Sequence, residues 1–247
     1  MKILIPILEN KIQDVDTPYG RSLYEIERKT ILQYICEALS AIKGAEMIFI
    51  LHRVDVAKYK LNSVVKILAP SAEIIVSQGD TGGAACSCML AFDKFVMDEP
   101  LIIYNSGHIV TVNLQDVTTY FLQKNYDGGI ITFDGVHPRW SYVKCDENNF
   151  VTEAAEKRPI SRNATSGFYY YKRTDDFVNA VFSMIKKEAS VDGKYYLCPV
   201  YNEMVLLGKK IGIYQIDQSQ YFNLNHRKGV ELYEEYLRNR RMFNEIV

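Results

Sequence analysis

A carboxylate and an ammonium stand side by side at Glu156 and Lys157, at the end of an extended stretch and just before a turn. A carboxylate accepts hydrogen bonds from hydroxyl groups, and an ammonium pairs with a phosphate. A little further on, Ser166 and Gly167 open another predicted strand, where a glycine lets a ligand approach the backbone closely. The segment therefore predicts a site for a small phosphorylated polyol.

A second candidate site is the glycine-rich segment 78–85, QGDTGGAA, which joins a predicted strand to a predicted helix. Its glycines would admit a ligand to the backbone, and the free N–H groups of the helix start favour anions. The amide of Gln78 has both a donor and an acceptor and can pair with the edge of a base. An ordinary glycine-rich connection has the same composition, so both interpretations stay open.

Strands and helices alternate along residues 1–110. The apolar runs predict strands at 2–8, 46–51, 73–77 and 100–105. The helical spacing of apolar residues predicts helices at 30–42, 54–68 and 83–96. This alternation indicates a parallel sheet with crossover helices. Ligands bind beyond the carboxyl ends of such strands, so the turns after Leu8, Ser77 and Tyr104 are expected to share one rim.

The pattern becomes mixed after residue 110. Strands are predicted at 128–133, 141–145, 150–155, 167–172 and 211–216, and helices at 115–125, 175–187 and 229–246. The last helix is rich in charged residues and is expected to present a solvated face with ion pairs at i,i+3 and i,i+4 spacing. We predict a single α/β domain with a nucleotide-side half at 1–110, an acceptor-side half at 111–217 and a C-terminal helix at 226–247.

The charge and composition argue against several classes of partner. With 29 basic and 30 acidic residues the formal net charge is −1, so the chain has no general attraction for nucleic acid or an anionic membrane. No run reaches the ~18 apolar residues of a membrane span. The five cysteines form no paired motif, which predicts reduced thiols in a cytoplasmic protein.

Four stretches carry a resemblance to a known family. They are SQGDTGGAACSCMLA at 77–91, DEPLIIYNSGHIV at 98–110, the segment 127–173 with its EKRP sequence, and KYYLCPVYNEMV at 194–205. The chain resembles the sugar nucleotidyltransferases, and most of all the bacterial branch found with capsule and surface-polysaccharide genes. That family has a Rossmann-like fold of the GT-A type. It transfers a nucleoside monophosphate from an NTP to a sugar phosphate or similar small phosphate, with release of pyrophosphate.

The resemblance implies a role for each matching residue. Arg21 and Lys157 would be the catalytic cations, and Lys157 would also bind the acceptor phosphate. Glu156 would bind acceptor hydroxyls. The other implied substrate-binding residues are Gln78, Gly82 and Gly83 at the base, and Gly129, Gly167 and Tyr169 at the acceptor. Asn202 and Glu203 fall near the place of the family's later metal-side acid, and the implied cofactor is Mg²⁺.

Three departures from the family pattern bear on that chemistry. The loop 9–16 has no glycine and carries Glu9, Asp14 and Asp16, whose charges would repel phosphates. Arg21 stands where the family has a lysine. Gly107 stands where the family has its first metal-binding aspartate. The loss of that carboxylate predicts a weakened magnesium site, and we assign no metal ligand in this sequence.

Three hypotheses from different classes follow. The first is an active nucleotidyltransferase that takes a nucleotide and a small phosphorylated substrate. The second is a catalytically degenerate member that binds a sugar phosphate or nucleotide sugar, as a regulator or as a subunit beside an active paralogue. The third is a redirected glycosyltransferase acting on a finished nucleotide sugar. A homo-oligomer is compatible with all three.

Overall fold

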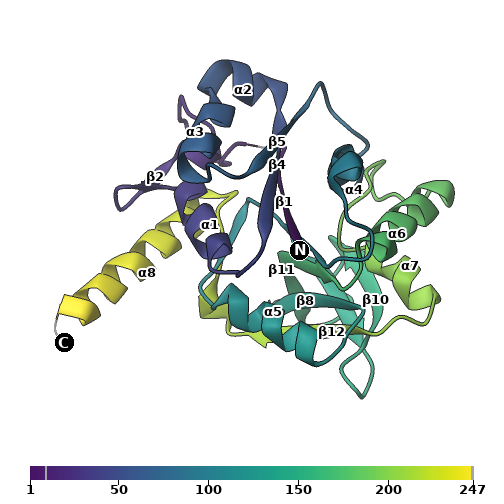
Figure 1. The fold of residues 1–247 in the computed structure, drawn as a ribbon. Helices are drawn as coiled ribbons and strands as arrows, with labels where there is room; N and C mark the ends of the chain where they lie inside the picture. Colours follow the sequence, from purple (N-terminus) through teal and green to yellow (C-terminus); the bar gives the residue numbers. More distant parts are fainter. Residues whose placement is uncertain (9, 246–247) are drawn as a thin grey trace.

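A mixed β-sheet forms the middle layer of the computed structural model, which describes residues 1–8 and 10–245 (Figure 1). Its main path within these residues runs β10-β9-β11-β6-β1-β4-β5, and β8 and β12 continue from β11. The strands are β1 (Lys2–Ile7), β4 (Glu46–His52), β5 (Glu73–Ser77), β6 (Leu101–Tyr104), β8 (Gly128–Asp134), β9 (Ser141–Cys145), β10 (Val151–Glu156), β11 (Asn163–Tyr171) and β12 (Ile211–Ile216).

Most of these strands point the same way. β1 pairs in parallel with β4 and β6, β4 pairs in parallel with β5, and β8 pairs in parallel with β12. β11 is antiparallel to both β6 and β8, so those two strands again share one direction. The carboxyl ends of β1, β5, β6, β8 and β12 therefore lie along one rim. This topology confirms the predicted α/β class and the shared rim.

Helices cover both faces of the sheet (Figure 1). They are α1 (Ile31–Ser40), α2 (Arg53–Tyr59), α3 (Leu61–Leu68), α4 (Ala84–Cys88), α5 (Leu114–Gln123), α6 (Thr174–Lys186), α7 (Val200–Leu206) and α8 (Arg227–Glu245). Along β1, Ile3 and Ile5 pack with α1, α3 and α5, whereas Leu4 packs with α4, α6 and α7. Both faces of β1 are buried, which explains its unbroken apolar sequence.

Several predicted boundaries were wrong. The helix predicted at 54–68 is divided into α2 and α3 because Lys60 adopts a left-handed φ of 53°. The helix predicted at 83–96 is α4 followed by a 3-10 turn, Met89–Lys94. β11 begins at Asn163, earlier than the predicted 167. Sequence reasoning also missed α7, whose short apolar stretch follows Pro199, and the pair β7 (His108–Val110) and β13 (Tyr221–Asn223).

The predicted charged helix is α8, which projects from the sheet beside β2 (Glu25–Ile26) (Figure 1). Val230 and Tyr233 are buried on its inner side. Arg238 forms the expected i,i+4 pair with Glu234 and also pairs with Glu27 at 3.0 Å. Within the described residues, no helix combines the length and apolar character needed to span a membrane.

Candidate functional site

The glycine-rich turn after β5 packs against residues 192–198, which we call the bridging segment. The Tyr195 amide donates to the Gly82 carbonyl at 2.7 Å, and the Ala85 amide donates to the Tyr195 carbonyl at 3.0 Å. Gly83 has a φ of +124°, and a Cβ atom there would lie 2.5 Å from the Tyr195 carbonyl oxygen. Gly83 therefore has to be a glycine for the turn to reach the bridging segment.

Gln78 directly follows β5 at the carboxyl rim. The Ser77 hydroxyl donates to the Gly79 carbonyl at 2.5 Å and so bends the chain at this point. The Gln78 side chain is exposed, and its amide nitrogen lies 3.4 Å from the Val76 carbonyl, at the outer limit of a hydrogen bond. The amide is thus accessible to a ligand at the rim, where the resemblance implies a base.

The Glu156-Lys157 pair lies on the other side of the bridging segment. β10 ends at Glu156, and Lys157 turns the chain with a left-handed φ of 53°. The Ser141 hydroxyl donates to the Glu156 carboxylate. The Lys157 ammonium donates to the Tyr196 hydroxyl at 3.0 Å and lies 3.8 Å from the Asp192 carboxylate. The bridging segment therefore joins the predicted acceptor pair to the glycine-rich turn.

Tyr169 on β11 and Cys198 at the end of the bridging segment are buried close to Glu156. The Tyr169 hydroxyl is 3.1 Å from the Thr165 hydroxyl, and burial raises the pKa of Tyr169, with smaller contributions from Cys198 and Glu156. Nearby on β11, the buried Ser166 hydroxyl has no hydrogen-bond partner among the described residues. An unsatisfied buried hydroxyl is costly unless something pairs with it, so a polar ligand would be favoured here.

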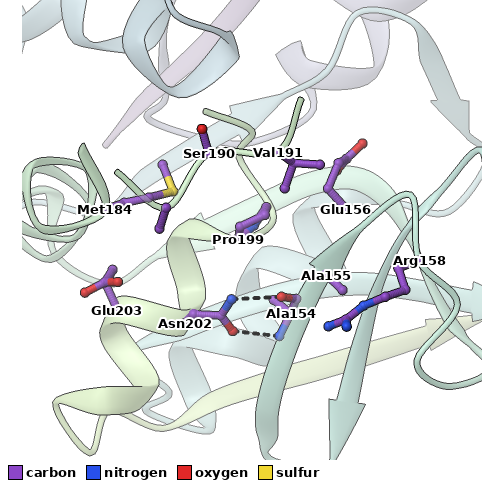
Figure 2. A pocket seen from close by; sticks show the side chains of 11 residues that line it. Ala154, Ala155, Glu156, Arg158, Met184, Ser190, Val191, Pro199, Asn202 and Glu203 are labelled. Carbon is purple, nitrogen blue, oxygen red and sulfur yellow. Dashed lines mark hydrogen bonds between the residues drawn. The ribbon is translucent and has the colours of Figure 1, made fainter. Parts of the chain in front are cut away.

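A cavity of about 360 Å³ opens beside Glu156 (Figure 2). The side chains of Met184, Val191 and Pro199 surround it, and β10 and α7 form its walls (Figure 2). The amide of Asn202 closes one end by accepting from the Ala154 amide at 2.7 Å and donating to its carbonyl at 2.8 Å. The cavity is large enough for a small ligand and extends the candidate acceptor side beyond the carboxylate.

The charge of Glu156 gives a stability prediction. Burial raises the pKa of this carboxyl, and the Ser141 hydroxyl and the Lys157 ammonium offset only part of that. Because the folded pKa lies above the unfolded one, the ionised form costs stability near neutral pH, and the cost disappears as the pH falls and the carboxyl is protonated.

We therefore expect Glu156→Gln to have a higher Tm than the wild type at about pH 7, with the difference shrinking toward about pH 4. Thermal unfolding across this range measures it. Glu147→Gln, at an exposed turn, is the control and should shift the Tm little. A lower Tm for Glu156→Gln at neutral pH would show that the ionised carboxylate stabilises the fold.

The two remaining predicted glycines lie in different places. Gly167 has a φ of +90°, and its carbonyl accepts from the Asn105 amide at 2.9 Å, so it lies at the carboxyl end of β6. Gly129 lies near the amino end of β8, where a Cβ atom would come within 2.6 Å of the Phe121 ring. The structure therefore brings Gly167 to the rim and places Gly129 in the packing of α5 on the sheet.

Arg21 is buried between β1, β6 and the segment before α8. Its guanidinium donates to the side-chain oxygen of Asn225 at 2.5 Å, to the Ser106 hydroxyl at 3.2 Å and to the Lys11 main-chain carbonyl at 3.4 Å. Only 3% of Arg21 is exposed. The guanidinium is thus held as a fixed positive charge beside Gly107, on the same rim as Gln78 and Gly167.

The loop that would wrap a triphosphate is bound to the segment 223–227. The Gln13 amide donates to the Asn225 carbonyl at 2.7 Å, and the Arg227 guanidinium donates to the Asp14 carbonyl at 2.8 Å. Asp14 and Asp16 are exposed, and the predicted third acid, Glu9, lies outside the described residues. The exposed carboxylates keep negative charge at this loop, as the sequence indicates.

The residues around Gly107 do not fit the implied magnesium ion. A Cβ atom on Gly107 would lie 2.5 Å from both amide atoms of Asn225, so a neutral amide fills the place of the missing carboxylate. His108 is bound through Nδ1 to the Tyr221 hydroxyl at 2.6 Å, and burial and then Arg21 lower its pKa. The described residues contain no cluster of three or more histidine, cysteine or acidic side chains that could hold a metal.

The suggested place of the later metal-side acid, Asn202 and Glu203, needs correction. Asn202 is bonded to β10, and the Glu203 carboxylate accepts from Ser183 and Lys187, both at 2.6 Å. These contacts hold α7 against α6. The side chain that faces Gly107 comes instead from Asn225, which sequence reasoning did not single out.

Gly107→Asp is expected to fail to restore a metal site. The new side chain would collide with Asn225, whose amide is fixed by Arg21, Asn223 and the Gly107 carbonyl. We expect a loss of about 1–3 kcal/mol in unfolding free energy and no gain in pyrophosphate release over the wild type. Chemical denaturation and a pyrophosphate assay with added Mg²⁺ measure both. Pyrophosphate release by this single variant well above that of the wild type would contradict the prediction.

Comparison with known proteins supports the fold. No protein-family model matches the chain, and no curated protein does. A nucleoside-diphosphate-sugar pyrophosphorylase from Vibrio cholerae superposes with a TM-score of 0.77 at 18% identity, covering 96% of this chain and 100% of its own. A UDP-glucose pyrophosphorylase complexed with UDP-glucose gives a TM-score of 0.74 at 14% identity, covering 96% and 98%. The chain has the fold of these nucleotide-sugar pyrophosphorylases.

Proposed function

We propose that this protein transfers a nucleoside monophosphate from an NTP to a sugar phosphate or similar small phosphate, in bacterial surface-polysaccharide metabolism. The observation that carries the proposal is the bridging segment, which holds the glycine-rich turn on one side and the Glu156-Lys157 pair on the other. A base-side turn and an acceptor-side pair on one rim are what the transfer of a nucleotide to a small phosphate needs. The shared fold and the sequence resemblance agree with it.

The reaction is an in-line displacement at the α-phosphorus. An oxygen of the acceptor phosphate forms the new bond to the α-phosphorus, the bond to the bridging oxygen of the β-phosphate breaks, and pyrophosphate leaves. Lys157 pairs with the acceptor phosphate, Glu156 accepts from its hydroxyls, and Arg21 supplies positive charge at the end of β1. Gln78 recognises the base. No protein side chain forms a covalent intermediate in this scheme.

A second candidate is favoured by the loop 10–16 and its contacts with Asn225. A member whose loop is bound by its own chain would bind a sugar phosphate or nucleotide sugar without turnover, as a regulator or beside an active paralogue. A glycosyltransferase that uses a finished nucleotide sugar would also have no need to bind a triphosphate at this loop. In both alternatives the Glu156-Lys157 pair still binds the ligand.

Calorimetric titration with CTP, dTTP, UTP, GTP and ATP, followed by a pyrophosphate-release assay with a panel of sugar 1-phosphates, tests the proposal. We expect one NTP to bind and to release pyrophosphate only when an acceptor is present. A chain that binds nucleotide sugars but neither binds an NTP nor releases pyrophosphate would support the second candidate and reject the transfer.

A further inference from the structure

The charge at the ends of β1 and β6 has a sign opposite to the one a metal site needs. A magnesium ion is held by hard, mostly anionic oxygen ligands. Here the fixed group is the buried guanidinium of Arg21, bound to Ser106, Asn225 and the Lys11 carbonyl. A second cation placed beside it would be repelled, and in a buried setting this repulsion is only weakly screened.

The neutral groups around the guanidinium are fixed in their positions. Asn225 donates to the Asn223 side chain at 3.0 Å and to the Gly107 carbonyl at 3.4 Å, while its own oxygen faces Arg21. The Leu224 amide donates to the Gly107 carbonyl at 2.8 Å. The asparagine is therefore oriented toward a cation by its neighbours, and it fills the space that a carboxylate at position 107 would need.

Asp55, on α2, is an acidic group whose titration this guanidinium influences. Burial raises the pKa of Asp55, and the Asn10 side chain, His52 and Arg21 each lower it. The described residues gather no group of three or more histidine, cysteine or acidic side chains, and a single carboxylate is a poor site for a divalent ion, which prefers several oxygen ligands.

We propose that this site binds the phosphate groups of its ligand through the fixed charge of Arg21 and needs no divalent metal ion. The inference deepens the proposed function and rests on it for the class of ligand. Arginine is suited to this task because its guanidinium is always charged and is weakly hydrated. A buried arginine can stabilise the negative charge of phosphate groups, which is the role of the metal ion in metal-dependent phosphate sites.

Calorimetry with inorganic pyrophosphate, the five NTPs and UDP-glucose, each in excess EDTA and in excess Mg²⁺, tests this. We expect the affinity of the ligand that binds best to change by less than about threefold between the two conditions. Tightening by about tenfold or more in Mg²⁺ would overturn the inference. Failure of every probe to bind in both conditions would overturn it as well.

Two variants tie the result to Arg21. Asn225→Asp keeps the shape of the side chain and places a carboxylate against the guanidinium. We therefore expect ligand binding in EDTA to weaken about tenfold. Asn148→Asp, the same change at an exposed turn, is the control. Arg21→Gln should weaken binding further, and thermal unfolding reports whether it folds. Unchanged binding by Asn225→Asp would overturn the inference. Metal-independent binding without pyrophosphate release would keep it and reject the transfer.

Discussion

Gly83→Ala is expected to lower the unfolding free energy by about 3 kcal/mol and the Tm by about 6–12 °C. Two costs add at this position. The backbone has a φ of +124°, which an alanine adopts only under strain, and the new methyl group would lie 2.5 Å from the Tyr195 carbonyl oxygen and 2.6 Å from its nitrogen. These are main-chain atoms, so they move only if the bridging segment moves.

Two glycines separate the two costs. Gly79 belongs to the same turn, and a Cβ atom there would meet nothing within 4 Å, so Gly79→Ala should change the stability by less than about 0.5 kcal/mol. Gly44 has a φ of +69° in open space, so Gly44→Ala should cost about 1 kcal/mol from the backbone alone. Chemical denaturation of the three variants gives the comparison. Equal losses for Gly83→Ala and Gly44→Ala would show that the contact with Tyr195 carries no energy.

Lys157→Met is expected to weaken the binding of a sugar 1-phosphate about 100-fold, because a charged hydrogen bond to phosphate contributes about 2–3 kcal/mol. The Lys157 ammonium is half exposed and held by Tyr196 and Asp192, so it is placed for a ligand without being buried by the protein. Methionine keeps most of the length of the side chain and removes the ammonium, with its charge and its hydrogen-bond donors. Calorimetry with the sugar 1-phosphate that binds the wild type best measures the change.

Lys144→Met is the matched control for that experiment. Lys144 is an exposed lysine on β9 and does not line the cavity beside Glu156, so its loss should leave the affinity within about twofold of the wild type. Tyr196→Phe removes the hydroxyl that holds the ammonium and should give an intermediate loss. Wild-type affinity in Lys157→Met, or no binding of any sugar 1-phosphate by the wild type, would contradict the assigned role.

The parallel half of the fold could be predicted because its signals are local. The apolar run 2–7 is buried on both faces, and the helical spacing in 30–42 corresponds to α1. The division at Lys60 could not be predicted, since a lysine carries no sign of a left-handed φ. The short pair β7 and β13 was missed because each strand is too brief to show a period.

The candidate site was predictable only where its chemistry lies in adjacent residues. Glu156 and Lys157 are adjacent in the sequence, so they could be recognised together as a candidate site. The bridging segment could not be recognised, because Tyr195 contacts Gly82 through main-chain atoms, and such contacts do not depend on the residue type. Asn225 was missed for a similar reason, since nothing local links it to Gly107 or Arg21.

The contacts between the segment 223–227 and the loop 10–14 also set an order of events during synthesis. The bond from Arg227 to the Asp14 carbonyl spans 213 positions in the chain. On the ribosome, β1, β4 and β5 can pair early, because their partners emerge within the first 77 residues. The loop after β1 and the guanidinium of Arg21 reach their final partners only after residue 227 has emerged. The rim that carries the candidate site is thus completed last, so a nascent chain paused before that point has most of its sheet but an open end at β1.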